Sequence, residues 1–233
     1  PTPHTPMSET LQTLQERLAR NYELAERDYP IGDRTLKIFH VANNFELLDR
    51  IDPQEFEQDE RLPYWAEVWP ASIALAEWVL SHPNHFQTRC LELGSGVGVV
   101  SVAAALAGAT LLTTDYFSDA LDFARLNAAV NQVTIEPYLL DWREITLTES
   151  FDCILAADVL YEARNHRPIL QAIDRLLAPT GTAYLGDPQR SIAQPFSRLA
   201  QEFSFRVERT TVTVAWEGRS LPVDLYQLTR NSG

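Results

Sequence analysis

From residue 70 onward, short apolar runs alternate with longer amphipathic segments. The apolar runs predict strands, and steps of three and four between apolar positions predict the helices between them. Runs that are apolar throughout, such as Cys153 to Ala157, predict strands buried on both faces, as in a parallel sheet covered by helices. The expected elements are a helix from Pro70 to the break at His82 and Pro83, strand 89–93, helix 98–106, strand 110–114, helix 118–130, strands 134–140 and 151–156, helix 167–177, strand 182–185 and helix 192–202.

Two further strands close this part of the chain. Residues 205–216 and 221–228 have strand character, and the turn 217–220 joins them. A short turn between strands predicts an antiparallel hairpin, which we expect at the edge of the sheet. The predicted fold class is therefore α/β: a doubly wound, seven-stranded sheet that is mostly parallel and ends in an antiparallel hairpin.

The pattern ahead of residue 61 is less regular. Apolar positions at helical spacing predict an amphipathic helix that follows Ser8 and ends near residues 28–30. Residues 34–41 alternate as a half-buried strand does, and 43–51 predict a short helix or turn before an acidic loop at 52–60. We expect the proline-rich residues 1–7 to be disordered. The expected division is an N-terminal extension, 1–60, and one domain, 61–233.

Composition narrows the class of protein. With 45% hydrophobic and 22% charged residues, 233 residues suit one globular domain with an extension. The net charge of −13 argues against a nucleic-acid partner, because phosphate binding depends on clusters of Lys and Arg. It would attract a basic protein surface, although solubility alone also explains it. No membrane-length apolar stretch and no signal peptide is present, so we expect a cytoplasmic protein without a membrane partner.

The possible metal ligands do not cluster in the sequence. Cys90 and Cys153 each lie inside an apolar strand run, which favours small core residues over a disulfide or a metal site. The five histidines are scattered without ligand spacing. We therefore expect no metal centre.

A glycine-rich turn follows the first strand of the domain. Gly94-Ser95-Gly96-Val97-Gly98 comes after Glu92 and opens the next helix. Such a turn lets the backbone approach a ligand closely and points helix N-terminal amides at it, which predicts a nucleotide-type site. Val99 stands where the dinucleotide fingerprint G-x-G-x-x-G/A has its last small residue, so that fingerprint is not met.

Polar residues also end the next two strands. Asp115, followed by Tyr116, can accept the hydroxyls of a ribose, although Asp115 could instead cap the following helix, where Ser118 is an alternative cap. Asp141 can bond the amino group of an adenine and Trp142 can support the ring, although Trp142 could equally be a surface-packed aromatic.

Two more segments are candidates for the reacting end of the site. The run from Ala156 to Glu162 leaves the fourth strand, where open α/β sheets place their reacting groups, and it contains Asp158 and Tyr161. These two could also be ordinary loop hydrogen bonders. Residues 62–70 hold Tyr64, Trp65 and Trp69, which would ordinarily be core packing.

Together these motifs resemble a known family. The acidic-x-Gly-x-Gly-x-Gly arrangement from Glu92 to Gly98 resembles the first motif of Rossmann-like, seven-strand methyltransferases that use S-adenosylmethionine. Residues 62–70 and 158–162 together resemble the protein-lysine methyltransferase group within them, in the form of a bacterial member. The resemblance covers about residues 60–190. The segment from Asp187 to Arg190 matches nothing in that group securely.

The resemblance implies a role for each candidate residue. Trp69 would line the methionine end of the cofactor, Gly94 and Gly96 its chain, Asp115 the ribose, Trp142 the adenine and Ala157 the sulfonium. Cofactor contacts are also expected from Glu92, Ser95, Tyr116 and Asp141. Asp158 and Tyr161 would face the incoming nucleophile, with S-adenosylhomocysteine as the product.

The expected function is S-adenosylmethionine-dependent N-methylation of a lysine on a protein substrate. In this hypothesis Asp158 docks the lysine, while Tyr64, Trp65 and Tyr161 form its channel. One alternative is methylation of a small amine metabolite. Another is a nucleotide-binding protein of a different class, such as an NAD-dependent oxidoreductase. The glycine spacing and the missing Tyr-x-x-x-Lys pair disfavour that class, since the single lysine is Lys37. The acceptor and the oligomeric state stay open.

Overall fold

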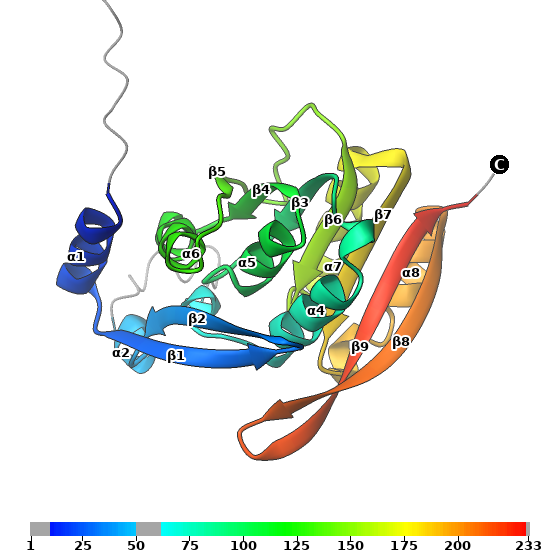
Figure 1. Cartoon of the computed structure of the whole chain (residues 1–233). Coiled ribbons are helices and arrows are strands. Elements are labelled where there is room, and N and C mark those ends of the chain that lie inside the picture. Colours follow the sequence, from blue (N-terminus) through cyan, green and yellow to red (C-terminus); the bar gives the residue numbers. More distant parts are fainter. Residues whose placement is uncertain (1–9, 50–61, 232–233) are drawn as a thin grey trace, which may run out of the picture.

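The computed structural model describes residues 10–49 and 62–231, and a seven-stranded sheet lies at its centre (Figure 1). The strand order is β5-β4-β3-β6-β7-β9-β8, with β3 to β7 parallel and the last two strands antiparallel. The strands are β3 (Arg89–Leu93), β4 (Thr110–Asp115), β5 (Glu136–Leu139), β6 (Phe151–Ala157), β7 (Leu177–Asp187), β8 (Phe205–Trp216) and β9 (Arg219–Arg230). The α/β prediction and the C-terminal edge hairpin are confirmed.

Helices cover both faces of the sheet. Successive residues of a strand point to opposite faces, so Cys90 of β3 and Cys153 of β6 pack into one apolar cluster, while Leu91 and Ile154 pack into the other. The first cluster contains α4 (Pro70–Ser81), α5 (Val99–Leu106) and α6 (Ser118–Val130), and the second contains α7 (Ala163–Leu176) and α8 (Phe196–Glu202). Both cysteines are free and buried, as expected. No helix in the described ranges is long and apolar enough to cross a bilayer.

The N-terminal segment corrects one prediction. Helix α1 (Leu11–Asn21) ends well before residue 28, and β1 (Leu24–Ile31) follows it and pairs antiparallel with β2 (Arg34–Val41). The expected helix was wrong beyond Asn21 because Tyr29 and Ile31 alternate with exposed residues and bury themselves as strand positions. The strand at 34–41 is confirmed, and α2 (Phe45–Leu48) is the short helix expected after it. The predictions for residues 1–7 and 52–60 lie outside the described residues.

The β1–β2 hairpin is fastened to the main domain. Asn127 of α6 accepts a hydrogen bond from the backbone N–H of Phe39 at 2.7 Å and donates one to its carbonyl at 2.9 Å. On α1, Arg17 pairs with Asp122 of α6 at 2.7 Å. The boundary expected at residue 60 stays a prediction, while these contacts join the N-terminal elements to α6.

Three other elements differ clearly from those expected, while β5 and β9 differ from the expected ranges by no more than two residues at either end. Helix α7 begins at Ala163 and carries Pro168 inside it, whereas the expected helix began near that proline. The expected helix over 192–202 is split into a 3₁₀ turn, η3 (Ser191–Ala193), and α8, because Pro195 stands between them and cannot continue a helix. Strand β7 is longer than expected at both ends, since Leu177 pairs with Phe151 of β6 and the pairing with β9 continues to Asp187.

Candidate active site

The candidate site is a cavity at the carboxyl ends of β3, β4 and β6. The chain leaves β3 toward β4 on one side and β6 toward β7 on the other, and at such a switch point the two loops diverge and leave a crevice. All twelve site residues expected from the sequence line this one cavity: Trp69, Glu92, Gly94, Ser95, Gly96, Asp115, Tyr116, Asp141, Trp142, Ala157, Asp158 and Tyr161. Their individual roles toward a ligand stay predictions.

The glycine turn forms the floor of the cavity, between β3 and α5. Gly94 has φ +68°, and a Cβ placed there would lie 2.9 Å from Cζ3 of Trp142. A side chain at position 94 would therefore be both strained and in collision with the indole. The indole of Trp142 thus packs directly on the backbone of this turn, and both residues line the cavity.

Asp115 joins the glycine turn to the end of β4. Its Oδ2 accepts the N–H of Gly96 and its Oδ1 accepts the N–H of Phe117, both at 2.9 Å. Burial raises the pKa of Asp115 to about 6, although these two backbone N–H groups oppose the shift. Each carboxylate oxygen keeps a further lone pair, so Asp115 can still accept hydroxyl groups from the cavity side.

Glu92 lies beneath the turn and is 1% exposed. The hydroxyl of Ser101 on α5 donates a hydrogen bond to its Oε2, and burial raises the pKa of Glu92 to about 8. At neutral pH the side chain is therefore mostly a protonated acid, able to donate as well as accept a hydrogen bond.

Asp141 and Trp142 follow β5 and line the side of the cavity next to the turn. The guanidinium of Arg143 binds Asp141 as a fork, with Nε 3.0 Å from Oδ1 and Nη2 2.8 Å from Oδ2. The backbone N–H of Arg143 also donates to Oδ1. The Asp141 carboxylate is thereby held in one orientation at the cavity rim, a geometry the sequence did not reveal.

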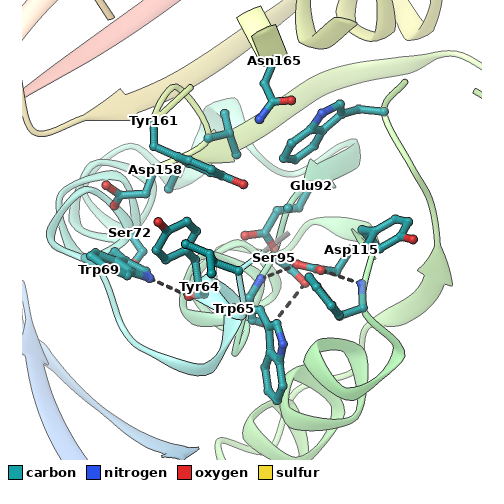
Figure 2. Close-up of a pocket in the computed structure, with 18 of the residues that line it drawn as sticks. Tyr64, Trp65, Trp69, Ser72, Glu92, Ser95, Asp115, Asp158, Tyr161 and Asn165 are labelled. Carbon is teal, nitrogen blue, oxygen red and sulfur yellow. Dashed lines mark hydrogen bonds between the residues drawn. The ribbon is translucent and has the colours of Figure 1, made fainter. Parts of the chain in front are cut away.

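An aromatic wall stands at the other end of the cavity. It comprises Tyr64 of the 3₁₀ turn η1 (Tyr64–Ala66), Trp69 at the start of α4, and Tyr161 after β6. The Tyr64 ring meets the Tyr161 ring at 5.1 Å and the Trp69 ring at 5.9 Å, both edge to face, and the Trp69 indole N–H donates to the Tyr64 carbonyl at 2.7 Å. Figure 2 shows these rings gathered at one end of the cavity.

Trp65 lies apart from this aromatic wall. Its ring is directed away from Tyr161 (Figure 2) and packs against Tyr22 and Phe123 at centroid distances of 5.7 and 5.6 Å. Trp65 also lines the cavity, but the 3₁₀ turn η1 points its side chain in another direction than that of Tyr64. A lysine channel formed by Trp65 with the two tyrosines stays a prediction.

Asp158 is held by two other segments. Its Oδ2 accepts the N–H of Ala71 in the first turn of α4, and its Oδ1 accepts Nη2 of Arg190, both at 2.8 Å. The carboxyl group is turned toward α4 in Figure 2, and only 7% of the side chain is exposed. Direct docking of a lysine by Asp158 stays a prediction.

Other cavity residues had escaped the sequence reasoning. Asn165 was missed because α7 was expected to begin four residues later, outside the reach of the cavity. Phe117 could have been found two residues after the strand-ending Asp115. Glu67 lies inside the candidate segment 62–70 without having been singled out, and the sequence offered no comparable signal for Ser72.

Comparison with known protein families agrees with this architecture. The model of a family described as lysine methyltransferase matches residues 52–202. The electron transfer flavoprotein beta subunit lysine methyltransferase of Danio rerio is 32% identical over 132 residues, which cover 55% of this chain and 51% of that protein. The match therefore spans about half of that relative. Protein N-lysine methyltransferase METTL21A of Xenopus tropicalis is 30% identical over 151 residues, covering 60% of this chain and 68% of the relative.

Solved structures share the fold. The T. thermophilus 16S rRNA N2 G1207 methyltransferase, solved with AdoMet and guanosine, superposes with a TM-score of 0.64 and 16% identity. The superposition covers 89% of this chain and 51% of that one. At such low identity the likeness extends to the arrangement of strands and helices and no further.

Proposed function

This chain belongs to the lysine methyltransferase family, and on that premise we propose that it is an S-adenosylmethionine-dependent N-methyltransferase acting on lysine side chains of protein substrates. One observation carries the proposal: the same cavity is lined by a glycine turn that suits a cofactor and by an aromatic wall that suits an amine. The glycine turn bears on the cofactor alone, so the aromatic wall carries the choice of acceptor.

The residues around the glycine turn fit the cofactor. The bare backbone of Gly94 lets the indole of Trp142 pack against the turn, and this indole can stack on an adenine. Asp115 has unused lone pairs for the two ribose hydroxyls, and its carboxylate is fixed by the amides of Gly96 and Phe117. When bound, S-adenosylmethionine supplies an electrophilic methyl group on a sulfonium.

The aromatic wall fits an aliphatic amine. The faces of Tyr64, Trp69 and Tyr161 carry negative electrostatic potential, which attracts an ammonium group by about 0.5 to 2 kcal/mol for each ring in contact. An apolar, partly dehydrated surrounding also lowers the pKa of an amine, so it favours the neutral nucleophile. The wall therefore binds the charged amine weakly and eases loss of its proton, and contact with the rings aligns the nitrogen.

The charge of the whole chain suits a basic protein acceptor. A net charge of −13 creates a field that draws positively charged partners and speeds their encounter. Lysine-bearing protein surfaces are such partners.

The proposal is tested by following label from tritiated S-adenosylmethionine into an extract of host cells. The wild-type protein is compared with Asp115→Ala, which removes the buried acceptor at the glycine turn, and with Asp119→Ala in the first turn of α6 as matched control. We expect label in protein bands for wild type and Asp119→Ala, and none for Asp115→Ala. Label confined to small molecules or to RNA would contradict a protein acceptor. Automethylation is removed by Lys37→Arg, since Lys37 is the only lysine in the chain.

A further inference from the structure

One guanidinium joins the loops that follow β6 and β7. Arg190 donates through Nη1 to Oδ1 of Asp187 and through Nη2 to Oδ1 of Asp158, both at 2.8 Å. The side chain of Asp187 has no exposed surface, and that of Asp158 is 7% exposed. Two carboxylates with almost no access to water therefore share one cation, which is the arrangement that such buried charges require.

Asp158 is fixed from every side by hydrogen bonds. Its second oxygen accepts the N–H of Ala71 on α4, and its own N–H donates to the carbonyl of Gly186 at 2.9 Å. Its φ of +58° lies in the left-handed region that favours glycine. A residue with a side chain persists in that region only when its surroundings hold it there, and here Arg190 is part of those surroundings.

These contacts connect the two halves of the aromatic wall. Ala71 lies two residues after Trp69, which caps α4, and Asp158 lies three residues before Tyr161. The Asp158–Ala71 hydrogen bond thus spans the cavity end between the segment of Trp69 and the segment of Tyr161. In Figure 2 the Asp158 carboxyl turns toward α4 while the ring of Tyr161 reaches into the cavity.

We propose that Arg190 is a positioning residue for methyl transfer: it clamps Asp158 against α4, and so fixes Trp69 and Tyr161 on the two sides of the Tyr64 ring, in the aromatic wall that receives the acceptor amine. The proposal rests on the function proposed above and deepens it. Arg190 is not among the residues that line the cavity, and it acts through Asp158 on the aromatic wall.

The charges around Asp158 give the clamp a pH dependence. Burial raises the pKa of Asp158 to about 6, while Arg190 and the Ala71 amide lower it and Asp187 raises it. Without Arg190, the lowering influence of the cation is lost and the repulsion from Asp187 stays. The pKa of Asp158 then rises further, and the carboxyl becomes protonated at a pH where it is ionised in the wild type. A protonated carboxyl holds the Ala71 amide less firmly.

The test compares Arg190→Gln and Arg190→Lys with Arg206→Gln, which removes an exposed arginine on β8 whose side chain is 69% exposed. Affinity for S-adenosylhomocysteine is measured by calorimetry. The kcat and KM for labelling extract protein are measured at several values between about pH 6 and about pH 9. The variant-to-wild-type ratio of kcat is plotted against pH, because titration of the acceptor amine cancels in that ratio.

We expect Arg190→Gln to keep its affinity for S-adenosylhomocysteine and to lose about tenfold to hundredfold in kcat through misalignment. The loss should deepen as pH falls from about 9 to about 6. Arg190→Lys, which restores the charge without the fork, should recover part of the rate and flatten the pH dependence of the ratio. Arg206→Gln should match the wild type.

A uniform loss at all pH values without rescue by lysine would overturn the positioning role, and so would an unchanged rate. Hydrogen exchange of residues 158–162 tests the clamp without any acceptor. Faster exchange in Arg190→Gln than in Arg206→Gln supports the clamp, and equal exchange overturns it. If the wild-type protein transfers no label, the result contradicts the proposed function and not the role of Arg190. The hydrogen-exchange comparison alone then tests whether Arg190 holds Asp158 against α4.

Discussion

Tyr22 of the N-terminal segment meets Trp65 edge to face, with ring centroids 5.7 Å apart and planes at 83°. Trp65 in turn lies on the glycine turn, because its carbonyl oxygen would be 3.3 Å from a Cβ at Gly96. The segment ahead of the sheet therefore supports the floor of the cavity through one aromatic pair. Phe123 of α6 packs on both rings and completes the support.

Tyr22→Ala should therefore loosen the cofactor site from a distance. We expect the unfolding free energy to fall by about 1 to 3 kcal/mol, and the dissociation constant for S-adenosylhomocysteine to rise about threefold as Trp65 loses its brace. Denaturant unfolding and calorimetry measure the two effects. Tyr138→Ala on the edge strand β5, where the tyrosine is 37% exposed, is the matched control and should change neither. An unchanged affinity in Tyr22→Ala would show that the N-terminal segment does not support the floor.

Two glycines with left-handed backbone allow the cost of backbone strain to be measured separately from the cost of a side-chain collision. Gly94 has φ +68° and faces Trp142, whereas Gly218 in the β8–β9 turn has φ +74° and open space where a Cβ would lie, with nothing within 4 Å. Gly218→Ala should cost about 1 kcal/mol of stability from backbone strain and leave affinity for S-adenosylhomocysteine unchanged. Gly94→Ala adds displacement of Trp142, so binding should weaken by about tenfold or more. Equal affinities in the two variants would contradict packing of the indole on the turn as a requirement for binding.

Because burial raises the pKa of Glu92, we expect the unfolding free energy of the chain to depend on pH. Its pKa is about 8 in the folded chain and near 4.5 when unfolded, so between these values the folded state binds the extra proton. The native state is therefore favoured at low pH, and this contribution is lost as pH rises from about 4.5 to about 8. Asp115, whose pKa burial raises to about 6, acts with the same sign up to about pH 6.

Glu92→Gln removes this dependence because glutamine is neutral throughout. The variant should match the wild type near pH 5 and exceed it near pH 8 by a few kcal/mol, with unfolding followed in denaturant at both values. Glu77→Gln, at an exposed position on α4, is the control and should follow the wild-type curve. A Glu92→Gln curve parallel to the wild type would mean that Glu92 is not the group whose proton is linked to folding.

Substitutions of Tyr161 should affect the acceptor end of the cavity without affecting the cofactor end. Tyr161→Ala opens the aromatic wall and should lower kcat/KM for protein labelling about hundredfold, while affinity for S-adenosylhomocysteine changes little. Tyr161→Phe keeps the ring and should retain most of the rate if the ring faces act on the amine. If Tyr161→Phe is as inactive as Tyr161→Ala, the hydroxyl matters more than the ring, and the role given to the aromatic face is wrong.

The sequence was most informative where one physical rule acted alone. Apolar runs located β3 and β6 within a residue, because burial on both faces of a strand leaves few alternatives. Residues that end parallel strands, such as Asp115 and Asp158, were placed correctly at the cavity since those strand ends converge. The N-terminal helix was overextended because pairing of β1 with β2 overrides a local helical period.

Contacts between residues far apart in the sequence could not be predicted from the pattern of apolar and polar positions. The segment containing Asp187 and Arg190 carried no recognisable motif, yet Arg190 reaches across 32 positions to Asp158. The opposite directions of Tyr64 and Trp65 depend on the 3₁₀ turn η1, which a dense aromatic run does not specify. Such contacts arise from how loops pack on one another after the sheet has formed.

The aromatic wall is proposed to direct a methyl group to lysine. The most direct test of this role is amino-acid analysis of protein labelled by the wild-type chain from tritiated S-adenosylmethionine, with Tyr161→Ala as the inactive comparison. We expect the label to be recovered as methyllysine and to be absent with Tyr161→Ala. Recovery of the label as methylarginine, or equal methyllysine with Tyr161→Ala, would contradict the role of the wall.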